Sequence, residues 1–527
     1  MNIVSTELGR ISGNKEEHRK TDRDAGHSNF QYVGNFLEKH GALPYSTQLL
    51  RIFSLARKLN FHSVLVDEIN CGECRQLMEE NAALKAFDNK YSHSQIYKFS
   101  FFGKEEQSNP PLFLGYAIYK IDHYQSVRSF GHVYEAVLSP PRTKKENNFL
   151  HCKRQYQVAN SSGNDYHVIG SLYAQQNAKT FVCAHVAIRT VLSCLLPEGD
   201  ISYATIRAIA GSGQGLGPAQ IERIFQSPGI SLSFNKQTYE PTTRHCQIDQ
   251  QHCRADHLLN NTIDYNKELY GFTESCLPSL LGFNLADGRR HIVPVLGHTF
   301  NEDSWVPSSN QNYFSNDFRF FSSEQWLSSH LIHDDNFGPY FCLPRHFLQP
   351  SNFRLLYGIS HDKSSFFSSE AEAAALAFFH RARNLLFIHG FSSPWTELFI
   401  AFKDFLVLRA IFTNKESYLH HLKTGLGTDS FDADKTIITG TLSERLPEKF
   451  WMVEASTIEL FPVTRRKFGE VVLAPINPEN GADWNSSFIM MRLPGCYFMK
   501  NPNEEKWIHQ DSAIQSHTQV YSYLDTP

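Results

Sequence analysis

The residues whose types and spacing best suit chemistry in this chain are Gln176 and Cys183, seven positions apart. Cys183 is expected to open an amphipathic helix over residues 183–196, because apolar side chains recur there with the helical period. A thiol at a helix N-terminus is stabilised as the thiolate by the helix dipole, and the thiolate is a nucleophile. A glutamine amide shortly upstream can donate a hydrogen bond to the oxyanion of a tetrahedral intermediate. The two residues together predict nucleophilic attack on a carbonyl group.

A nucleophilic cysteine needs a base, and His291 is the strongest candidate. It opens an apolar strand over residues 291–296, so its ring is expected at the rim of a sheet. Asp334 and Asp335 follow the apolar segment 331–333, which is the next plausible core strand. A carboxylate on a neighbouring strand can hold the imidazole in one orientation. The order of cysteine, histidine and aspartate therefore predicts a nucleophile, a base and an orienting group.

Several nearby residues stay open as alternates for these roles. His185 is expected on the exposed face of its helix, and His298 is expected in the hairpin after the base strand. The alternates are Gln175 for Gln176, His185 and His298 for His291, and Asp335, Asn301, Asp303 and Asn310 for Asp334.

Residues 166–345 resemble the papain-like cysteine peptidases, most of all the bacterial branch that includes the double-glycine leader peptidases of bacteriocin exporters. The resemblance lies in the upstream glutamine, the Cys-Ala start of an apolar helix, and the segment 215–224. It extends to the strand that begins with histidine and reaches Gly297, and to the aspartate with Gly338 four residues later. It implies an α+β, papain-like fold, with the cysteine on a helix and the histidine and aspartate on an antiparallel sheet.

Carried over residue by residue, the resemblance implies Cys183 as nucleophile, His291 as base, Asp334 as orienting group and Gln176 as oxyanion donor. It implies a cysteine-dependent hydrolase, most simply a peptidase that acts on a protein or peptide and needs no cofactor or metal. Two alternatives remain open. One is a catalytically inactive papain-like fold that serves as a protein-binding module, and the other is a thiol acyltransferase.

The chain departs from the family pattern in three places. The gap from Gln176 to Cys183 is one residue longer than is common, and Ala184 stands where the family usually has glycine. Residues 301–325 lengthen the connection between the base strand and the acid strand, and they carry six aromatic side chains. We expect this insertion near the rim beside Cys183, packed against a neighbouring domain, because so many exposed aromatic residues would be unfavourable.

Composition shifts along the chain predict three domains after a tail. A polar, basic stretch over residues 139–148 indicates a surface connection and a boundary. The expected parts are a flexible tail (1–30), an N-terminal α/β domain (31–150), a papain-like domain (151–350) and a C-terminal, strand-rich α+β domain (351–527).

Charge and hydropathy exclude several classes of function. The 527 residues include 50 Lys and Arg against 54 Asp and Glu, a net charge of −4, which disfavours a nucleic-acid partner. There is no apolar stretch of membrane-spanning length and no signal sequence, so no membrane partner is expected. Ten irregularly spaced cysteines in such a chain indicate reduced thiols and a cytoplasmic location.

Two other cysteine groups have spacings that deserve comparison with metal sites. Cys71 and Cys74 form a single CxxC with no second pair at a familiar distance, which is most simply coincidence. The polar loop 244–257 contains enough ligands for one zinc ion, although polar loops also collect such residues by chance. Those ligands are Cys246, Cys253, His245, His252 and His257.

Overall fold

The computed structural model folds the chain into two compact units, Met1–Gln237 with Pro278–Thr299 and Ser329–Asp362, and Thr238–Leu277 with Phe300–Ser328 and Lys363–Pro527. The structure describes the following residues: 3–4, 6, 8, 34–35, 38–39, 46–103, 112–125, 129–140, 148–159, 164–177, 179–211, 215–230, 232–238, 265–285, 288–302, 304–307, 311–312, 319–348, 353–360, 368–389, 397, 399, 401, 406–425, 443–475, 484–500, 507–511, 518–519 and 521. It is a mixed α+β structure, as expected for the fold class.

The two units do not follow the expected division into domains. Tyr116 and Tyr134 pack in one core with Ile188 and Val191, although these pairs were assigned to different domains. The boundary expected near residue 150 therefore falls inside the first unit. The division placed at residue 350 also differs from the structure, in which the first unit extends to Asp362.

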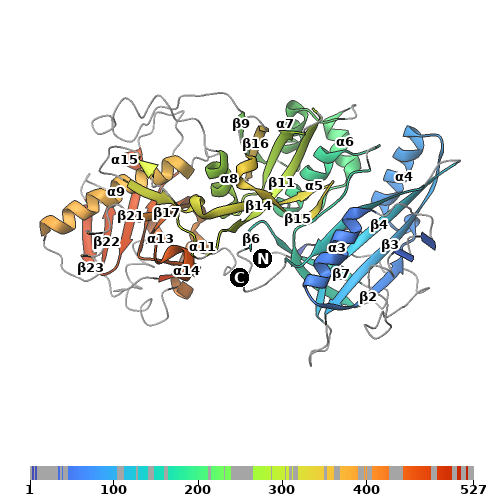
Figure 1. The fold of residues 1–527 in the computed structure, drawn as a ribbon. Helices are drawn as coiled ribbons and strands as arrows, with labels where there is room; N and C mark the ends of the chain where they lie inside the picture. The colour runs from blue at the N-terminus through green and yellow to red at the C-terminus, as the bar shows by residue number, and fades with distance from the viewer. Residues whose placement is uncertain are drawn as a thin grey trace. The chain divides into compact units, whose positions relative to one another are not determined.

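The N-terminal part of the first unit is an antiparallel sheet in the order β2-β3-β4-β5 (Figure 1). The expectation of an α/β domain is wrong, because β3, β4 and β5 follow one another as antiparallel neighbours. Helix α3 packs on this sheet through a face that includes Leu49, Ile52 and Phe53. The elements are α3 (Thr47–Lys58), β2 (Phe61–Glu68), η2 (Cys71–Glu73), α4 (Arg75–Phe87), β3 (Tyr91–Gly103), β4 (Phe113–Tyr124) and β5 (Phe130–Leu138).

The start of the chain is ordered where a flexible tail was expected. Strand β1 (Ile3–Val4) pairs in parallel with β7 (Arg154–Ala159), and β7 pairs with β8 (Asp165–Gly170). Leu8 is fully buried, and the Thr6 hydroxyl donates to Glu135 at 2.7 Å. The expectation failed for these residues because it weighed the charged composition of the whole tail. The rest of 1–30 lies outside the described residues.

The central sheet of the first unit carries the candidate histidine and aspartate. Its strands lie in the order β15-β14-β11-β10-β16-β9, and β6 also pairs with β11. The strand expected at 291–296 is the middle of β11, and the strand expected at 331–333 is the end of β14. The bounds are β6 (Asn148–Leu150), β9 (Ser233–Thr238), β10 (Ser279–Asn284), β11 (Arg290–Phe300), β14 (Leu327–Asp334), β15 (Gly338–Pro344), η5 (Arg345–Phe347) and β16 (Phe353–Ser360).

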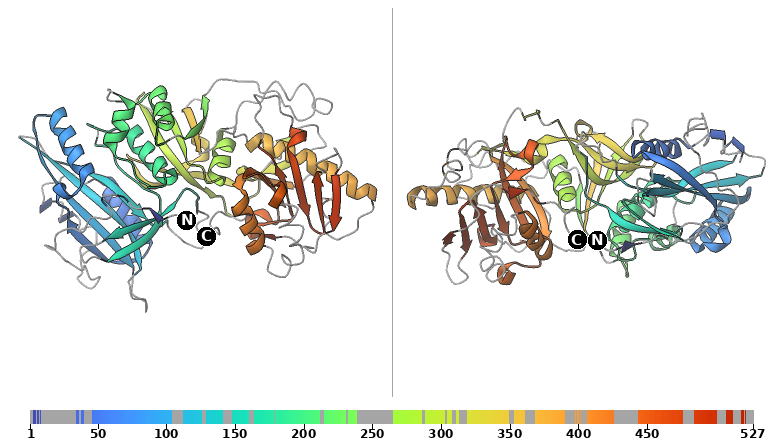
Figure 2. Two further views of the ribbon diagram at one scale, coloured as in Figure 1. Left: turned by 180° about the vertical axis from the view of Figure 1, so that it is seen from behind. Right: turned by 90° about the horizontal axis from the view of Figure 1, so that it is seen from below.

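Three helices pack beside the central sheet (Figure 2). They are α5 (Cys183–Leu195), α6 (Tyr203–Ala210) and α7 (Pro218–Gln226), close to the helices expected from the sequence. Val191 and Ile206 share a core with Leu280 of β10 and Ile292 of β11. Among the described helices of the whole chain, none is long and apolar enough to cross a membrane.

The second unit is built on an eight-stranded sheet in the order β12-β13-β17-β18-β20-β21-β22-β23. This agrees with the strand-rich α+β character expected for the C-terminal region. The strands are β12 (Gln311–Asn312), β13 (Arg319–Ser322), β17 (Leu406–Asn414), β18 (Lys449–Thr457), β19 (Arg466–Lys467), β20 (Gly469–Leu473), β21 (Phe488–Leu493), β22 (Cys496–Lys500), β23 (Trp507–Asp511) and β24 (Thr518–Gln519). The helices are α8 (Tyr265–Glu274), η4 (Ser323–Trp326), α9 (Ser368–His389), α11 (Lys415–Gly425), α13 (Ser443–Arg445), α14 (Phe461–Thr464) and α15 (Trp484–Ser487).

The insertion 301–325 contributes strands to the sheet of the second unit. Within it, β13 pairs in parallel with β17, and Phe320 and Phe321 are buried, which agrees with the packed arrangement expected for it. The insertion follows the end of β11, nine residues or about 30 Å along the strand from His291.

A row of buried charges crosses the sheet of the second unit. Arg409, Glu454, Glu470 and Arg492 are successive register partners on β17, β18, β20 and β21. Lys467 donates to Glu454 at 2.7 Å and lies 2.9 Å from Glu470. Burial opposes ionisation of Glu470, but Arg492 and Lys467 outweigh it and hold the pKa of this carboxyl well below its usual value. Glu454 and Glu470 are register partners of each other, and Lys467, which pairs with both, offsets their repulsion.

Replacing Glu470 by glutamine should lower the stability of the fold, because Arg492 and Lys467 stay buried without their partner charge. Glu470→Gln leaves Arg492 and Lys467 short of one negative charge, so we expect the free energy of unfolding to fall by about 3 kcal/mol. Glu416→Gln, at an exposed position in α11, should change it by about 0.5 kcal/mol or less. Denaturant unfolding of the full chain measures both, and equal effects of the two variants would contradict the prediction.

Candidate active site

Cys183 is the first residue of helix α5, as the sequence predicts. The N-cap residue, Val182, offers no side-chain cap, so the first amide groups of the helix need other acceptors. The amide of Cys183 donates to Oε1 of Gln176 at 3.1 Å. The cysteine is half-buried, which leaves its thiol accessible to a reactant at the positive end of the helix dipole.

The loop that joins Gln176 to Cys183 is organised by one asparagine. Oδ1 of Asn177 accepts from the amides of Lys179, Thr180 and Phe181 at 2.9, 3.0 and 3.2 Å. Nδ2 of Asn177 donates to Glu80 of helix α4 at 3.0 Å. These bonds fix the backbone that leads into α5, and therefore the position of Cys183.

Glu80 is the group that anchors this loop from outside. It is almost completely buried, and its carboxylate also accepts from the Thr180 hydroxyl. Its other oxygen lies 2.9 Å from Arg207 of helix α6, which balances the buried charge. Glu80 thus connects α4, the loop and α6.

His291 and Asp334 come together at one edge of the central sheet. His291 is the second residue of β11, Asp334 is the last residue of β14, and the two strands are neighbours. Nε2 of His291 lies 3.2 Å from Oδ2 of Asp334 and 3.4 Å from Oδ1 of Asp335. Nδ2 of Asn336 lies 3.4 Å from the same nitrogen.

The thiol of Cys183 is close enough to His291 to contribute to the raised pKa of its imidazole. Because the carboxylates face Nε2, Nδ1 is the ring nitrogen left for the sulfur. Phe283 of β10 covers the imidazole edge to face, with ring centroids 5.3 Å apart. The structure therefore brings together Cys183, His291 and Asp334, the three residues that the sequence predicted, with Gln176 beside the cysteine.

The electrostatics of the site favour a protonated imidazole. Burial works against the charge on His291, but the hydrogen bonds with Asp334 and Cys183 and the charges of both carboxylates outweigh burial and raise its pKa to about 10. Burial, opposed by His291 and reinforced by Asp334, raises the pKa of Asp335 to about 6. With a pKa of about 10, the imidazole of His291 is charged at neutral pH.

Asp334 is better placed than Asp335 to orient the histidine. Oδ1 of Asp334 accepts from the amides of Asn336 and Phe337 at 2.8 and 3.3 Å, so the carboxylate is fixed by its own turn. Oδ2 of Asp335 is buried without a hydrogen-bond partner among the described residues. Both carboxylates face the same nitrogen of His291, but the side chain of Asp334 is held by two backbone hydrogen bonds that Asp335 lacks.

The other alternates have different surroundings. Gln175 accepts from the Val133 amide and the Ser46 hydroxyl, away from the cysteine. His185 is buried, contrary to expectation, and its Nδ1 accepts from the Val182 amide. His298 lies 3.3 Å from His151, about 23 Å along β11 from His291. Asn301 lies beyond the end of β11, and Asp303 and Asn310 lie outside the described residues.

Two groups bear on metal binding. His291, Asp334 and Asp335 have ligand atoms within 4.8 Å of one another, a spacing compatible with a metal ion. In the structure the imidazolium supplies the positive charge between these carboxylates. The loop 244–257, with Cys246, Cys253 and His257, lies outside the described residues.

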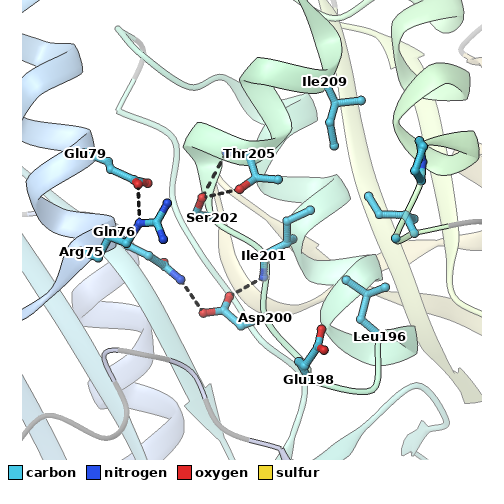
Figure 3. A pocket seen from close by; sticks show the side chains of 13 residues that line it. Arg75, Gln76, Glu79, Leu196, Glu198, Asp200, Ile201, Ser202, Thr205 and Ile209 are labelled. Carbon is cyan, nitrogen blue, oxygen red and sulfur yellow. Dashed lines mark hydrogen bonds and ion pairs between the residues drawn. The ribbon is translucent and has the colours of Figure 1, made fainter.

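A cavity of about 390 Å³ lies at the other end of helix α5 (Figure 3). It is bordered by Gln76 and Glu79 of α4, by Leu196 and Asp200 after α5, and by Thr205 of α6. Leu196 is 13 residues, or about 20 Å of helix, from Cys183. The cavity is therefore separate from the thiol.

Sequence reasoning missed Glu80, Asn336 and Gln48, which surround the predicted residues. A signal existed for Asn336, because Asp-Asn-Phe-Gly is a turn sequence directly after Asp334. No signal existed for Glu80 and Gln48, since their partners are far away in the chain.

Loss of the Glu80 carboxylate should loosen the loop before Cys183. Glu80→Gln keeps the shape but removes the charge opposite Arg207, so we expect a loss of about 2 kcal/mol in unfolding free energy. Amide exchange at Thr180 and Phe181 should become faster. Glu79→Gln, one residue away in an exposed pair with Arg75, is the matched control and should leave this exchange unchanged.

The protonation of His291 should depend more on Asp334 than on Asp335. Below pH 6.5 the imidazole is charged in both folded and unfolded chains, so its ion pairs stabilise the fold fully, and this contribution is lost as pH rises through about 10. Asp334→Asn should lower the titration midpoint of His291 by about 1 to 2 pH units, and Asp335→Asn by less. NMR of the imidazole measures both, and a larger shift for Asp335→Asn would reverse the assignment.

Comparison with known proteins gives no relative from which a role could be taken. No family model matches the chain, and neither a curated protein nor a solved structure matches it.

Proposed function

We propose that this protein is a cysteine-dependent hydrolase, most simply a peptidase, with Cys183 as nucleophile, His291 as acid and base, and Asp334 as orienting group. The observation that carries the proposal is the imidazole of His291, held by carboxylates at 3.2 and 3.4 Å and within reach of a half-buried thiol at a helix N-terminus. A reduced thiol is required, which fits the cytoplasmic location inferred from the sequence.

The proposed reaction begins with attack of the Cys183 thiolate on a carbonyl carbon of the substrate. The carbonyl oxygen takes the electron pair and becomes an oxyanion. The imidazolium of His291 then gives its proton to the leaving amine as the carbon–nitrogen bond breaks, which leaves an acyl thioester and a neutral imidazole. Water attacks the thioester, the imidazole takes its proton, and the acid is released with the thiolate restored.

Gln176 has a specific part in this scheme. Its Oε1 accepts from the Cys183 amide in the resting structure, so this amide becomes a donor to the substrate only after the carboxamide turns. Rotation of the carboxamide presents its NH₂ group on the same side. The oxyanion then receives one bond from the backbone and one from Gln176.

The same intermediate leads to an acyltransferase if an amine replaces water. An inactive binding module is the remaining alternative. Contact between Cys183 and His291, with carboxylates on the far side of the ring, supports the enzyme over the module.

Alkylation at limiting iodoacetamide tests the activated thiol without knowledge of the substrate. We expect Cys183 to react at least about tenfold faster than Cys71, which is also half-buried but whose pKa is raised by burial. Cys194, whose pKa burial raises to about 12, should react slowest. Peptide mass mapping gives the three rates.

A parallel assay with a mixed peptide library links the thiol to turnover. Hydrolysis by the wild type that is absent in Cys183→Ala is the expected result. Equal alkylation rates for Cys183 and Cys71, together with no hydrolysis, would reject the enzyme in favour of the binding module.

A further inference from the structure

The turn that carries both carboxylates is held from outside by a glutamine of helix α3. Nε2 of Gln48 donates to the carbonyl oxygens of Asp335 and Asn336 at 3.1 and 2.6 Å. These carbonyls belong to the two residues directly after Asp334. Gln48 is buried, so water does not readily replace these bonds.

The orientation of the Gln48 amide is fixed as firmly as its position. Its Oε1 accepts from the Thr47 hydroxyl at 3.1 Å and lies 2.9 Å from the Ser46 hydroxyl, whose single hydrogen is shared with Gln175, so the NH₂ group faces the turn. Ser46 is the N-cap of α3 and accepts from the amide of Leu49. The apolar face of α3 then anchors this arrangement to the antiparallel sheet.

Fixing the two carbonyls fixes the carboxylates. The peptide units of residues 335 and 336 set where the amides of Asn336 and Phe337 point, and Oδ1 of Asp334 accepts from both. Oδ2 is then directed at His291. Asp335 has no comparable side-chain support, so its place beside His291 depends on the backbone.

We propose that Gln48 is a positioning residue for the candidate active site. By donating to the carbonyl oxygens of Asp335 and Asn336, it keeps the carboxylates of Asp334 and Asp335 facing His291. This inference rests on the proposed function, because it assigns Gln48 a role in the same site. Gln48 bonds to backbone carbonyls and acts through the turn, so it is not a catalytic residue.

Arg51, one helical turn further along α3, provides a matched control. It donates to the carbonyls of Pro339 and Tyr340 at 3.2 and 3.1 Å, so it also fastens α3 to this part of the sheet. Its bonds lie beyond the carboxylates. Loss of Arg51 should therefore weaken packing without moving the groups that face His291.

The test compares Gln48→Met with Arg51→Met in the full chain. The groups facing His291 are Asp334 and Asp335 from the turn, Cys183 from α5, and the uncharged Asn336 and Phe283. We expect Gln48→Met to lower the titration midpoint of His291 by about one pH unit, because the carboxylates become free to move away. Arg51→Met removes a positive charge and should not lower the midpoint.

The midpoint is read by NMR with labelled histidine, and the signal is assigned with His291→Gln. Gln48→Asn, which keeps both donors but is shorter by one carbon, should give a smaller shift and serves if Gln48→Met does not fold. An unchanged midpoint in a folded Gln48 variant would overturn the proposal. So would an equal lowering by Arg51→Met.

The rate of Cys183 alkylation at pH 9, measured on the same variants, separates this proposal from the proposed function. If both are right, Gln48→Met reduces the charged fraction of His291 at pH 9 from about nine-tenths to about half and lowers this rate by up to about twofold relative to the wild type. A lowered His291 midpoint with a Cys183 no faster than Cys71 supports Gln48 as a positioning residue and rejects the hydrolase.

Discussion

Two carboxylates converge on one imidazole nitrogen, and the arrangement of the first unit follows from the need to hold them there. Asp334 and Asp335 would repel each other in this buried place without the positive charge of His291. The same positive charge lies beside Cys183, the nucleophile of the proposed reaction. Holding both carboxylates against one nitrogen costs conformational entropy, because two adjacent side chains cannot face one atom unless their backbone is fixed. Helix α3 and the turn supply that rigidity.

The second unit also buries charged side chains, but it holds them in a different arrangement. Its buried charges lie in one row across four strands, and strand register alone brings Arg409 opposite Glu454 and Glu470 opposite Arg492. Arg409 also pairs with Glu274 of α8, so three cations offset three carboxylates in this cluster. In the first unit two carboxylates face one imidazole, and burial, opposed by His291 and reinforced by Asp334, raises the pKa of Asp335 to about 6. Unequal buried charges are typical of sites that handle protons, whereas balanced rows are typical of structure.

How much could be predicted from the sequence depended on how far apart in the chain the interacting residues lie. Helix α5 follows from the periodicity of its own residues, and His291 and Asp334 could be found because each stands at the end of an apolar strand. Gln48 could not be found, because its partner Asp335 is 287 positions away. The two-unit division was hidden because residues 278–299 return to the first core after a segment that belongs to the second.

The contact between Gln176 and Cys183 shows how a resting site can be stable and still receive a substrate. A free amide at the start of a helix is costly when no acceptor is near, and the Gln176 carboxamide oxygen serves as that acceptor. In the proposed reaction the substrate oxygen takes this place, and the same side chain turns its NH₂ group toward the new negative charge. The exchange replaces one neutral hydrogen bond by two bonds to an anion, which are stronger. Because the gain arises only once the oxyanion forms, the rotation of Gln176 would stabilise the tetrahedral intermediate more than the bound substrate, which is the condition for catalysis.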